Sequence, residues 1–211
     1  MISRRFTLSA LAAAPLTGLM TGLMTGPVLA QATLSAATAK DFVEQSGQKL
    51  VGIVNSQAPE AKKADELRGL VNQIVAVDQV GDYVLGRYLH IATPAQHQEF
   101  QKLFHKLLAY NITYQIRAYQ GVSFSVDGVA PQGQDMVVNT VVTTPGHAPA
   151  DVGWAVDEVN GKPQIVDVIV AGTSLRITTR NDYASVITGH GGQVSALLTA
   201  MKAQIARIDA S

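Results

Sequence analysis

The sequence of 211 residues contains no cysteine. This absence excludes disulfides, thiol catalysis, zinc sites that need cysteine, and a lipid anchor attached to a cysteine at a processing site. Charged residues make up only 15% of the chain and aromatic residues only 6%. So few charges argue against long disordered tails. An apolar share of 47% over this length is typical of a single domain with a real core.

The chain also lacks an excess of positive charge. It has 16 basic and 16 acidic residues, and the first 30 residues hold Arg4 and Arg5 but no acidic residue. Without that segment, 14 basic and 16 acidic residues remain, a net charge of −2. No basic field is left to hold a nucleic acid, and no polybasic stretch is present for anionic lipid surfaces.

Residues 1–30 read as an export signal. Arg4 and Arg5 form a positive start, an apolar region runs from Leu8 to Met24, and small residues surround Ala30. We expect cleavage after Ala30 or two residues later, which predicts a periplasmic protein. The stretch around the two arginines partly resembles a twin-arginine signal, so the general secretory and twin-arginine routes both stay open.

The first half of the remaining chain has helical periodicity. Apolar residues at helical spacing predict helices over 40–54, 61–76 and 78–91. Thr93-Pro94-Ala95-Gln96 has the pattern of a capping box with proline in the first turn. We therefore expect a fourth helix to begin there and to run to about Tyr119.

The second half alternates apolar and polar residues with the period of strands. Four strands are expected, over 122–126, 136–144, 152–159 and 165–170. Asn160-Gly161 predicts a two-residue hairpin between the last two. Helical spacing returns over 179–187 and 193–208. The layout predicts an α+β fold, with a helical N-terminal half, an antiparallel sheet of about four strands and a C-terminal helix.

Two blocks of sequence resemble a known family. The first runs from Val77 to Tyr88 and continues into the capping box and Glu99-Phe100; the second runs from Ile165 to Leu175 and is followed by 179–183. Together they are similar to the toluene-tolerance family of periplasmic phospholipid-binding proteins, the MlaC-like components of the Mla intermembrane lipid transport system. The similarity spans about residues 39–208. The family includes a hopanoid-associated branch.

The resemblance implies a single lipid-binding domain over 31–211, without a cofactor, that is not an enzyme. It implies a carrier that shuttles phospholipid between an outer-membrane lipoprotein and porin complex and an inner-membrane ABC transporter complex. It also implies a structural motif at Asp167, Gly172, Ser174 and Arg180. Gly172 and Ser174 would form a tight bend, and Asp167 would pair with Arg180; the alternative is that Arg180 meets a lipid phosphate.

A lipid carrier needs an apolar cavity between its sheet and its helices, because exposed acyl chains are costly in water. The predicted lining comes from the inner sheet face and from aromatic helix stripes: Tyr83, Leu85, Tyr88, Phe104, Leu107, Tyr110, Trp154, Val156, Val168 and Val170. The alternative interpretation is that these side chains form an ordinary filled core.

Other functions remain as alternatives to a phospholipid carrier. These are a hopanoid or isoprenoid carrier, a small-molecule isomerase or hydrolase on a cone-like α+β fold, and a structural envelope adaptor. The five histidines include His97 and His105, eight residues apart on one helix and too distant to share a metal directly. No metal site is therefore expected, and no nucleophile elbow or phosphate loop is present.

Overall fold

A computed structural model describes residues 34–114 and 119–210. The predicted export signal over 1–30 lies outside the described residues. Within the described ranges no helix has the length and apolar character needed to cross a membrane.

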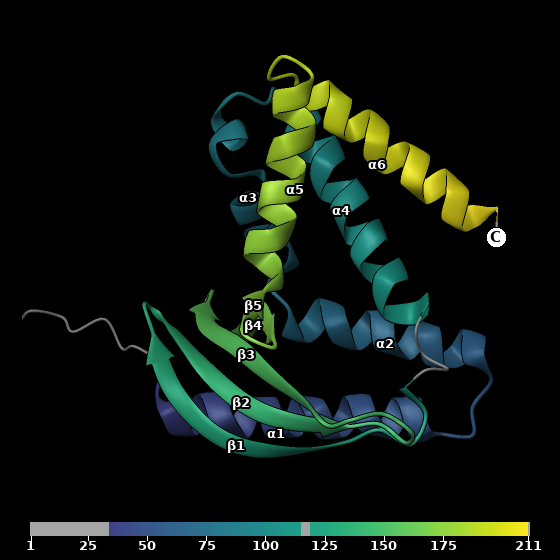
Figure 1. Cartoon of the computed structure of the whole chain (residues 1–211), viewed down its shortest axis with the longest axis vertical. Helices are drawn as coiled ribbons and strands as arrows, with labels where there is room; N and C mark the ends of the chain where they lie inside the picture. The colour runs from purple at the N-terminus through teal and green to yellow at the C-terminus, as the bar shows by residue number, and fades with distance from the viewer. Residues whose placement is uncertain (1–33, 115–118, 211) are drawn as a thin grey trace, which may run out of the picture. The chain divides into compact units, whose positions relative to one another are not determined.

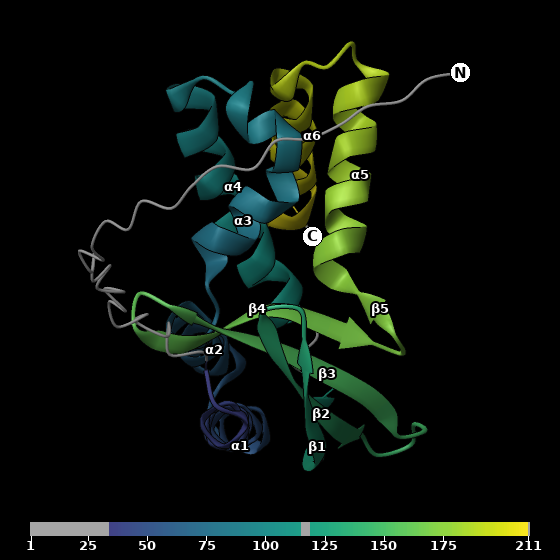
Figure 2. The same cartoon turned by 90° about the vertical axis from the view of Figure 1, so that its left-hand side faces the viewer.

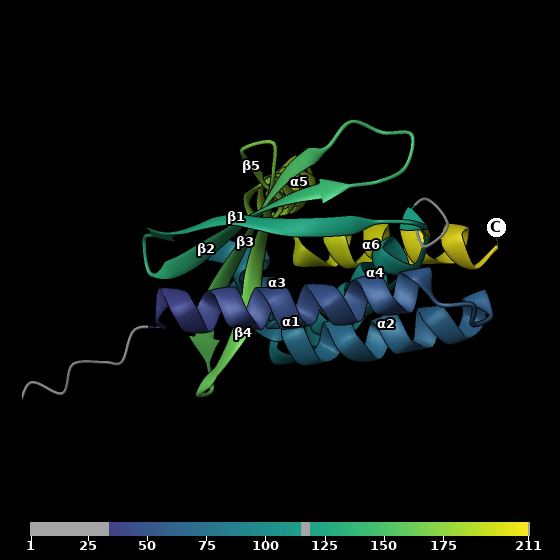
Figure 3. The same cartoon turned by 90° about the horizontal axis from the view of Figure 1, so that it is seen from below.

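Two long helices open the described chain. Helix α1 spans Ala36–Asn55 and begins at Ser35, whose hydroxyl accepts the amide of Thr38 over 3.0 Å. Helix α2 spans Glu60–Ile74 and follows Pro59. The two helices lie side by side in Figure 3 and are packed against each other.

The predicted capping box is confirmed. Helix α3 spans Val77–Leu85, a 3-10 helix η1 covers Gly86–His90, and helix α4 spans Pro94–Tyr114. The amide of Gln96 donates to the Thr93 hydroxyl over 3.2 Å, and the amide of Thr93 donates to the Gln96 side chain over 3.0 Å. The expected continuation of α4 over 115–118 lies outside the described residues.

The last two helices complete a helical core. Helix α5 spans Leu175–Gly189 and starts four residues before the predicted 179–187 segment, while helix α6 spans Val194–Asp209. Helices α3, α4, α5 and α6 stand together on one side of the sheet in Figures 1 and 2. Their shared core consists of buried apolar side chains and includes Leu85, Tyr88, Phe100, Phe104, Leu107, Ile187, Leu197 and Met201.

The strands form one antiparallel sheet in the order β1-β2-β3-β4-β5. They are β1 Ser123–Gln132, β2 Asp135–Thr143, β3 Ala150–Val159, β4 Lys162–Val170 and β5 Thr173–Ser174. The expected four strands gain a short fifth, because Ala171 and Gly172 turn β4 back on itself. The Asn160-Gly161 hairpin is confirmed, with φ of 53° and 74° at its two residues.

We call the sheet face that carries Trp154 and Val168 the inner face; those two residues are paired across β3 and β4. The N-terminal half of α1 packs directly on one end of this face, where Ala39 and Val43 meet Val138 and Val156 in a filled cluster. At the other end the inner face is not filled, and this is where the site lies.

Candidate functional site

An apolar cavity of about 360 Å³ lies between the inner face and helices α1 and α2. None of its described lining residues carries a charge. Ser46 and Asn111 are the polar side chains of that set, and Tyr119 adds a phenol. The lining is completed by Val43, Gly47, Leu50, Val51, Val54, Leu67, Ile74, Val122, Phe124, Val142, Val152, Trp154, Ile165, Val168, Val170 and Leu175.

The Trp154 side chain forms part of the wall without leaving a polar atom unpaired. Its indole N–H donates to the Thr140 hydroxyl over 2.9 Å, and that hydroxyl donates to the carbonyl of Val152 over 3.0 Å. Thr140 is 2% exposed, so these bonds are shielded from water. The indole ring can therefore face an apolar ligand at no hydrogen-bonding cost.

The cavity is open to solvent at one end. Large apolar side chains are normally covered, yet Val170 is 38% exposed, Tyr119 is 42% exposed and Leu175 is 46% exposed, and all three line the cavity. Ile177, two residues beyond Leu175, is 48% exposed. Exposed apolar side chains that surround a cavity mark a route inward for an apolar ligand.

Two polar side chains fix the C-terminal end of α1 beside the cavity. The Asn55 side chain donates to the carbonyl of Val122 over 3.1 Å and accepts the amide of Gly121 over 2.8 Å. The ammonium of Lys63, which is 3% exposed, donates to the carbonyl of Val54 over 2.8 Å. Positive charge at a helix C-terminus is favourable, so these bonds hold α1 against α2 and the start of β1.

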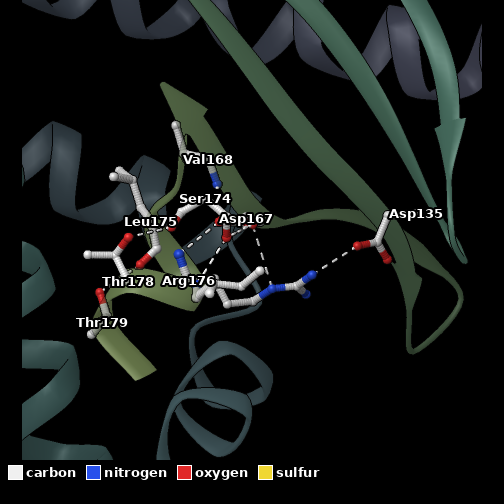
Figure 4. Close-up of polar contacts among 9 residues, drawn as sticks. Asp135, Asp167, Val168, Ser174, Leu175, Arg176, Thr178 and Thr179 are labelled. Atoms are coloured by element: carbon white, nitrogen blue, oxygen red, sulfur yellow. Dashed lines mark hydrogen bonds and ion pairs between the residues drawn. The ribbon is translucent and has the colours of Figure 1, made fainter. Parts of the chain in front are cut away.

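A buried carboxylate joins the sheet to helix α5 (Figure 4). Asp167, 7% exposed, accepts the Ser174 hydroxyl over 2.5 Å and the amide of Arg176 over 2.9 Å. The Arg176 guanidinium lies 3.8 Å from Asp167 and 3.2 Å from Asp135. Burial raises the pKa of the Asp135 carboxyl, and the neighbouring Arg176 opposes that rise. The Ser174 hydroxyl also caps α5 by accepting the amide of Ile177 over 3.0 Å.

The predicted pair of Asp167 with Arg180 is wrong, because Arg176 takes that place. Helix α5 begins at Leu175, so Arg176 lies in its first turn next to Asp167, whereas Arg180 lies one turn further on. The guanidinium groups of Arg176 and Arg180 lie 4.3 Å and 5.0 Å from the ring centre of Tyr83. The tyrosine ring thus joins helices α3 and α5.

Gly172 occupies the bend that the resemblance implies. Its φ is 77°, that of the preceding Ala171 is 48°, and the turn links Val170 to its partner Thr173. Glycine adopts such a conformation without steric cost, which explains its place in this turn.

The cavity lining differs from the predicted set of ten residues. Trp154, Val168 and Val170 line the cavity. The other seven lie elsewhere: Leu85, Tyr88, Phe104 and Leu107 belong to the helical core, Tyr110 packs against that core, Val156 lies under α1, and Tyr83 contacts the two arginines. Helix stripes reveal that a face is buried, but not whether protein or empty space lies opposite it.

Sequence reasoning missed most of the lining, including the walls that α1 and α2 contribute, the lining residues of β1 and β2, and Ile165 of β4. A β-bulge interrupts the β3–β4 register, so that Val156 is opposite Ile165 while Ala155 is opposite Asp167. The extra residue lets Ile165 and Val168 both line the cavity, although they are three positions apart. Simple alternation would have placed them on opposite faces.

The two histidines of α4 each pair with an acidic residue of α3. His97 lies 2.7 Å from Asp82, and His105 lies 2.8 Å from Asp78. Among the residues in the described ranges, no group of three or more metal-binding side chains comes together. These histidines therefore join two helices of the core.

Comparison with known proteins places this geometry in a family. A curated relative, the toluene tolerance protein ttg2D of Pseudomonas putida, is 23% identical over 197 residues, which is 90% of each chain. A solved structure of a phospholipid-binding protein from Ralstonia solanacearum, in complex with a phospholipid, has a TM-score of 0.70 at 21% identity. That likeness covers 81% of this chain and 98% of the other and shows a shared fold. The sequence profile described as MlaC protein matches residues 44–203, so the chain belongs to the MlaC family.

Proposed function

We propose that this protein is a periplasmic lipid carrier that holds phospholipid acyl chains in the cavity between α1, α2 and the inner face. The observation that carries the proposal is a cavity of about 360 Å³, lined almost entirely by apolar side chains and open at one end. Its volume lies within the range of roughly 300–1,000 Å³ that is usual for small-molecule sites.

The physical reason is the cost of exposing acyl chains during transfer. Two sixteen-carbon chains hold about 28 methylenes, and at about 0.8 kcal/mol each their exposure to water costs on the order of 20 kcal/mol. A carrier lowers this barrier by offering the acyl chains an apolar wall that is shielded from water. Such a site needs no reactive side chain. The charge-free lining supplies such a wall, while the exposed Val170 and Leu175 give the chains a way in.

The related proteins support phospholipid as the cargo. The Ralstonia solanacearum protein, whose fold this chain shares, was solved with a phospholipid bound. Membership of the MlaC family supports transfer between an outer-membrane lipoprotein and porin complex and an inner-membrane ABC transporter complex. The export signal proposed for residues 1–30 would bring the protein to the periplasm, where such a carrier works.

Catalysis has little support at this site. General acid–base and nucleophilic mechanisms need ionisable or activated side chains at the reacting atoms. Asp135 and Asp167, the two acidic residues that contact Arg176, lie outside the cavity lining. We therefore propose binding and transfer without a reaction.

The proposal is tested by lipid extraction from the purified protein, followed by mass spectrometry. We expect phospholipid in the wild type and at least ten-fold less in Val168→Glu, because that change places a carboxylate among the acyl chains. Lys162→Glu, at an exposed position of the same strand, is the charge control. Val166 lies on the same strand but is not a suitable control position. It is 1% exposed in a separate apolar cluster, so a glutamate there would destabilise the protein itself.

Two results would contradict the proposal. One is a wild-type protein that carries no lipid and takes up none from vesicles. The other is a folded Val168→Glu variant that carries as much phospholipid as wild type.

A further inference from the structure

Helix α1 has a glycine where it faces the aromatic ring of β1. A Cβ atom added at Gly47 would lie 2.3, 2.7 and 2.9 Å from three carbons of the Phe124 ring. Carbon atoms pack at about 3.5–4.0 Å, so the ring occupies the space that any other residue at position 47 would fill. Both Gly47 and Phe124 line the cavity.

A glycine inside a helix needs a reason, because it weakens the helix relative to alanine. Helix α1 has a second glycine, Gly52, whose added Cβ would meet nothing within 4 Å. Sterics therefore give no reason for glycine at position 52, whereas at position 47 the close ring gives one. The contrast within one helix separates the effect of the ring from the general effect of glycine.

The cavity that the Phe124 ring lines offers free space to the displaced ring. Phe124 is opposite Val142 in the sheet register, and Val142 also lines the cavity. A side chain at position 47 would push the ring away from α1 by more than about 1 Å to restore normal contact. Because the cavity adjoins the ring, the ring would move into the volume that acyl chains occupy.

We propose that Gly47 sets the acyl-chain capacity of the cavity by seating the Phe124 ring against α1. This inference rests on the proposed function, since it concerns the lipid that the cavity holds. Gly47 and Phe124 act as a pair. Because Gly47 has no side chain, the Phe124 ring fits against α1 and stays out of the volume that the lipid occupies. The absence of a side chain at position 47 therefore sets the width of the cavity where α1 faces Phe124.

The experiment compares Gly47→Ala with Gly52→Ala in the mature protein. Delipidated protein is equilibrated with vesicles of phosphatidylethanolamine carrying either sixteen-carbon or twelve-carbon chains, and bound lipid is measured by native mass spectrometry. We expect Gly47→Ala to lose about four-fold in affinity for each methylene that no longer fits, from about 0.8 kcal/mol per buried methylene. The loss should be larger with sixteen-carbon chains, and Gly52→Ala should match wild type.

A double variant tests the mechanism. Gly47→Ala combined with Phe124→Ala removes the collision, so it should regain the affinity for sixteen-carbon lipid that Gly47→Ala loses. It also keeps the test valid if Gly47→Ala alone folds poorly. Equal affinities of Gly47→Ala and Gly52→Ala for sixteen-carbon lipid, or no recovery in the double variant, would overturn the inference about Gly47. The carrier function would still stand in that case, provided that the wild type binds lipid. Wild type that takes up no lipid would overturn both.

Discussion

Gly86 and Arg180 fit against each other because glycine has no side chain. Gly86 ends helix α3 with φ of 57° and ψ of −128°, a region that L-amino acids with a side chain avoid. An added Cβ would lie 2.8 Å from Nε of Arg180. Backbone conformation and side-chain packing therefore both require glycine at this junction of α3 and α5.

We expect Gly86→Ala to lower the free energy of unfolding by about 2 kcal/mol or more, because backbone strain and the contact with Arg180 add. Urea denaturation gives the value. Gly172→Ala is the control, since Gly172 also has a positive φ of 77° but its added Cβ meets nothing within 4 Å. If the two variants lost equal stability, the contact with Arg180 would contribute nothing.

The hydrogen bond between Trp154 and Thr140 predicts a second stability effect. Thr140→Val would keep the shape of the side chain but remove the hydroxyl that accepts the indole N–H and donates to the Val152 carbonyl, which leaves the indole N–H without that partner. Burial of an unsatisfied polar group costs about 1–3 kcal/mol, so we expect a loss of that size in urea denaturation. Thr143→Val, at an exposed position of the same strand, should change stability by less than about 0.5 kcal/mol. Equal values for the two variants would show that the bond is not stabilising.

Tyr183 predicts a change in stability at alkaline pH. Burial raises the pKa of Tyr183 to about 12, and its ring packs edge-on against Phe100 at a centroid distance of 6.1 Å. The unfolded chain, with a tyrosine pKa of about 10, ionises first as pH rises. The stability that neutral Tyr183 contributes is therefore present below pH 10 and is lost between about pH 10 and 12.

Tyr183→Phe removes this ionisation and keeps the ring. We expect the variant to become more stable relative to wild type by roughly 2 kcal/mol as pH rises from 9 to 12, in urea titrations at each pH. Other ionising groups affect both proteins alike, so the difference isolates Tyr183. A difference that does not change with pH would contradict the assignment.

Much of the fold could be predicted because its determinants are local. The α+β layout, the capping box at Thr93 and the Asn160-Gly161 hairpin each depend on a few neighbouring residues, and the structure confirms them. The start of α5 was placed too late because the first turn exposes Leu175 and Ile177, which gives it no helical apolar stripe.

The site could be predicted only in part because a cavity is a property of several elements together. Val156 shares the inner face with Trp154, but α1 fills the space over Val156 and leaves the space beside Trp154 open. No periodicity in β3 distinguishes these two positions. The β4 bulge that turns Ile165 toward the cavity likewise depends on pairing with β3.

The central claim is that acyl chains enter the cavity, and the single tryptophan of the chain reports on it directly. Trp154 lines the cavity, and bromine quenches indole fluorescence only near contact. Phospholipid brominated midway along its chains should quench Trp154 in the wild type and leave it unchanged in Val168→Glu. Equal fluorescence of the wild type with brominated and unbrominated lipid, when mass spectrometry shows lipid bound, would place the chains elsewhere and contradict the account.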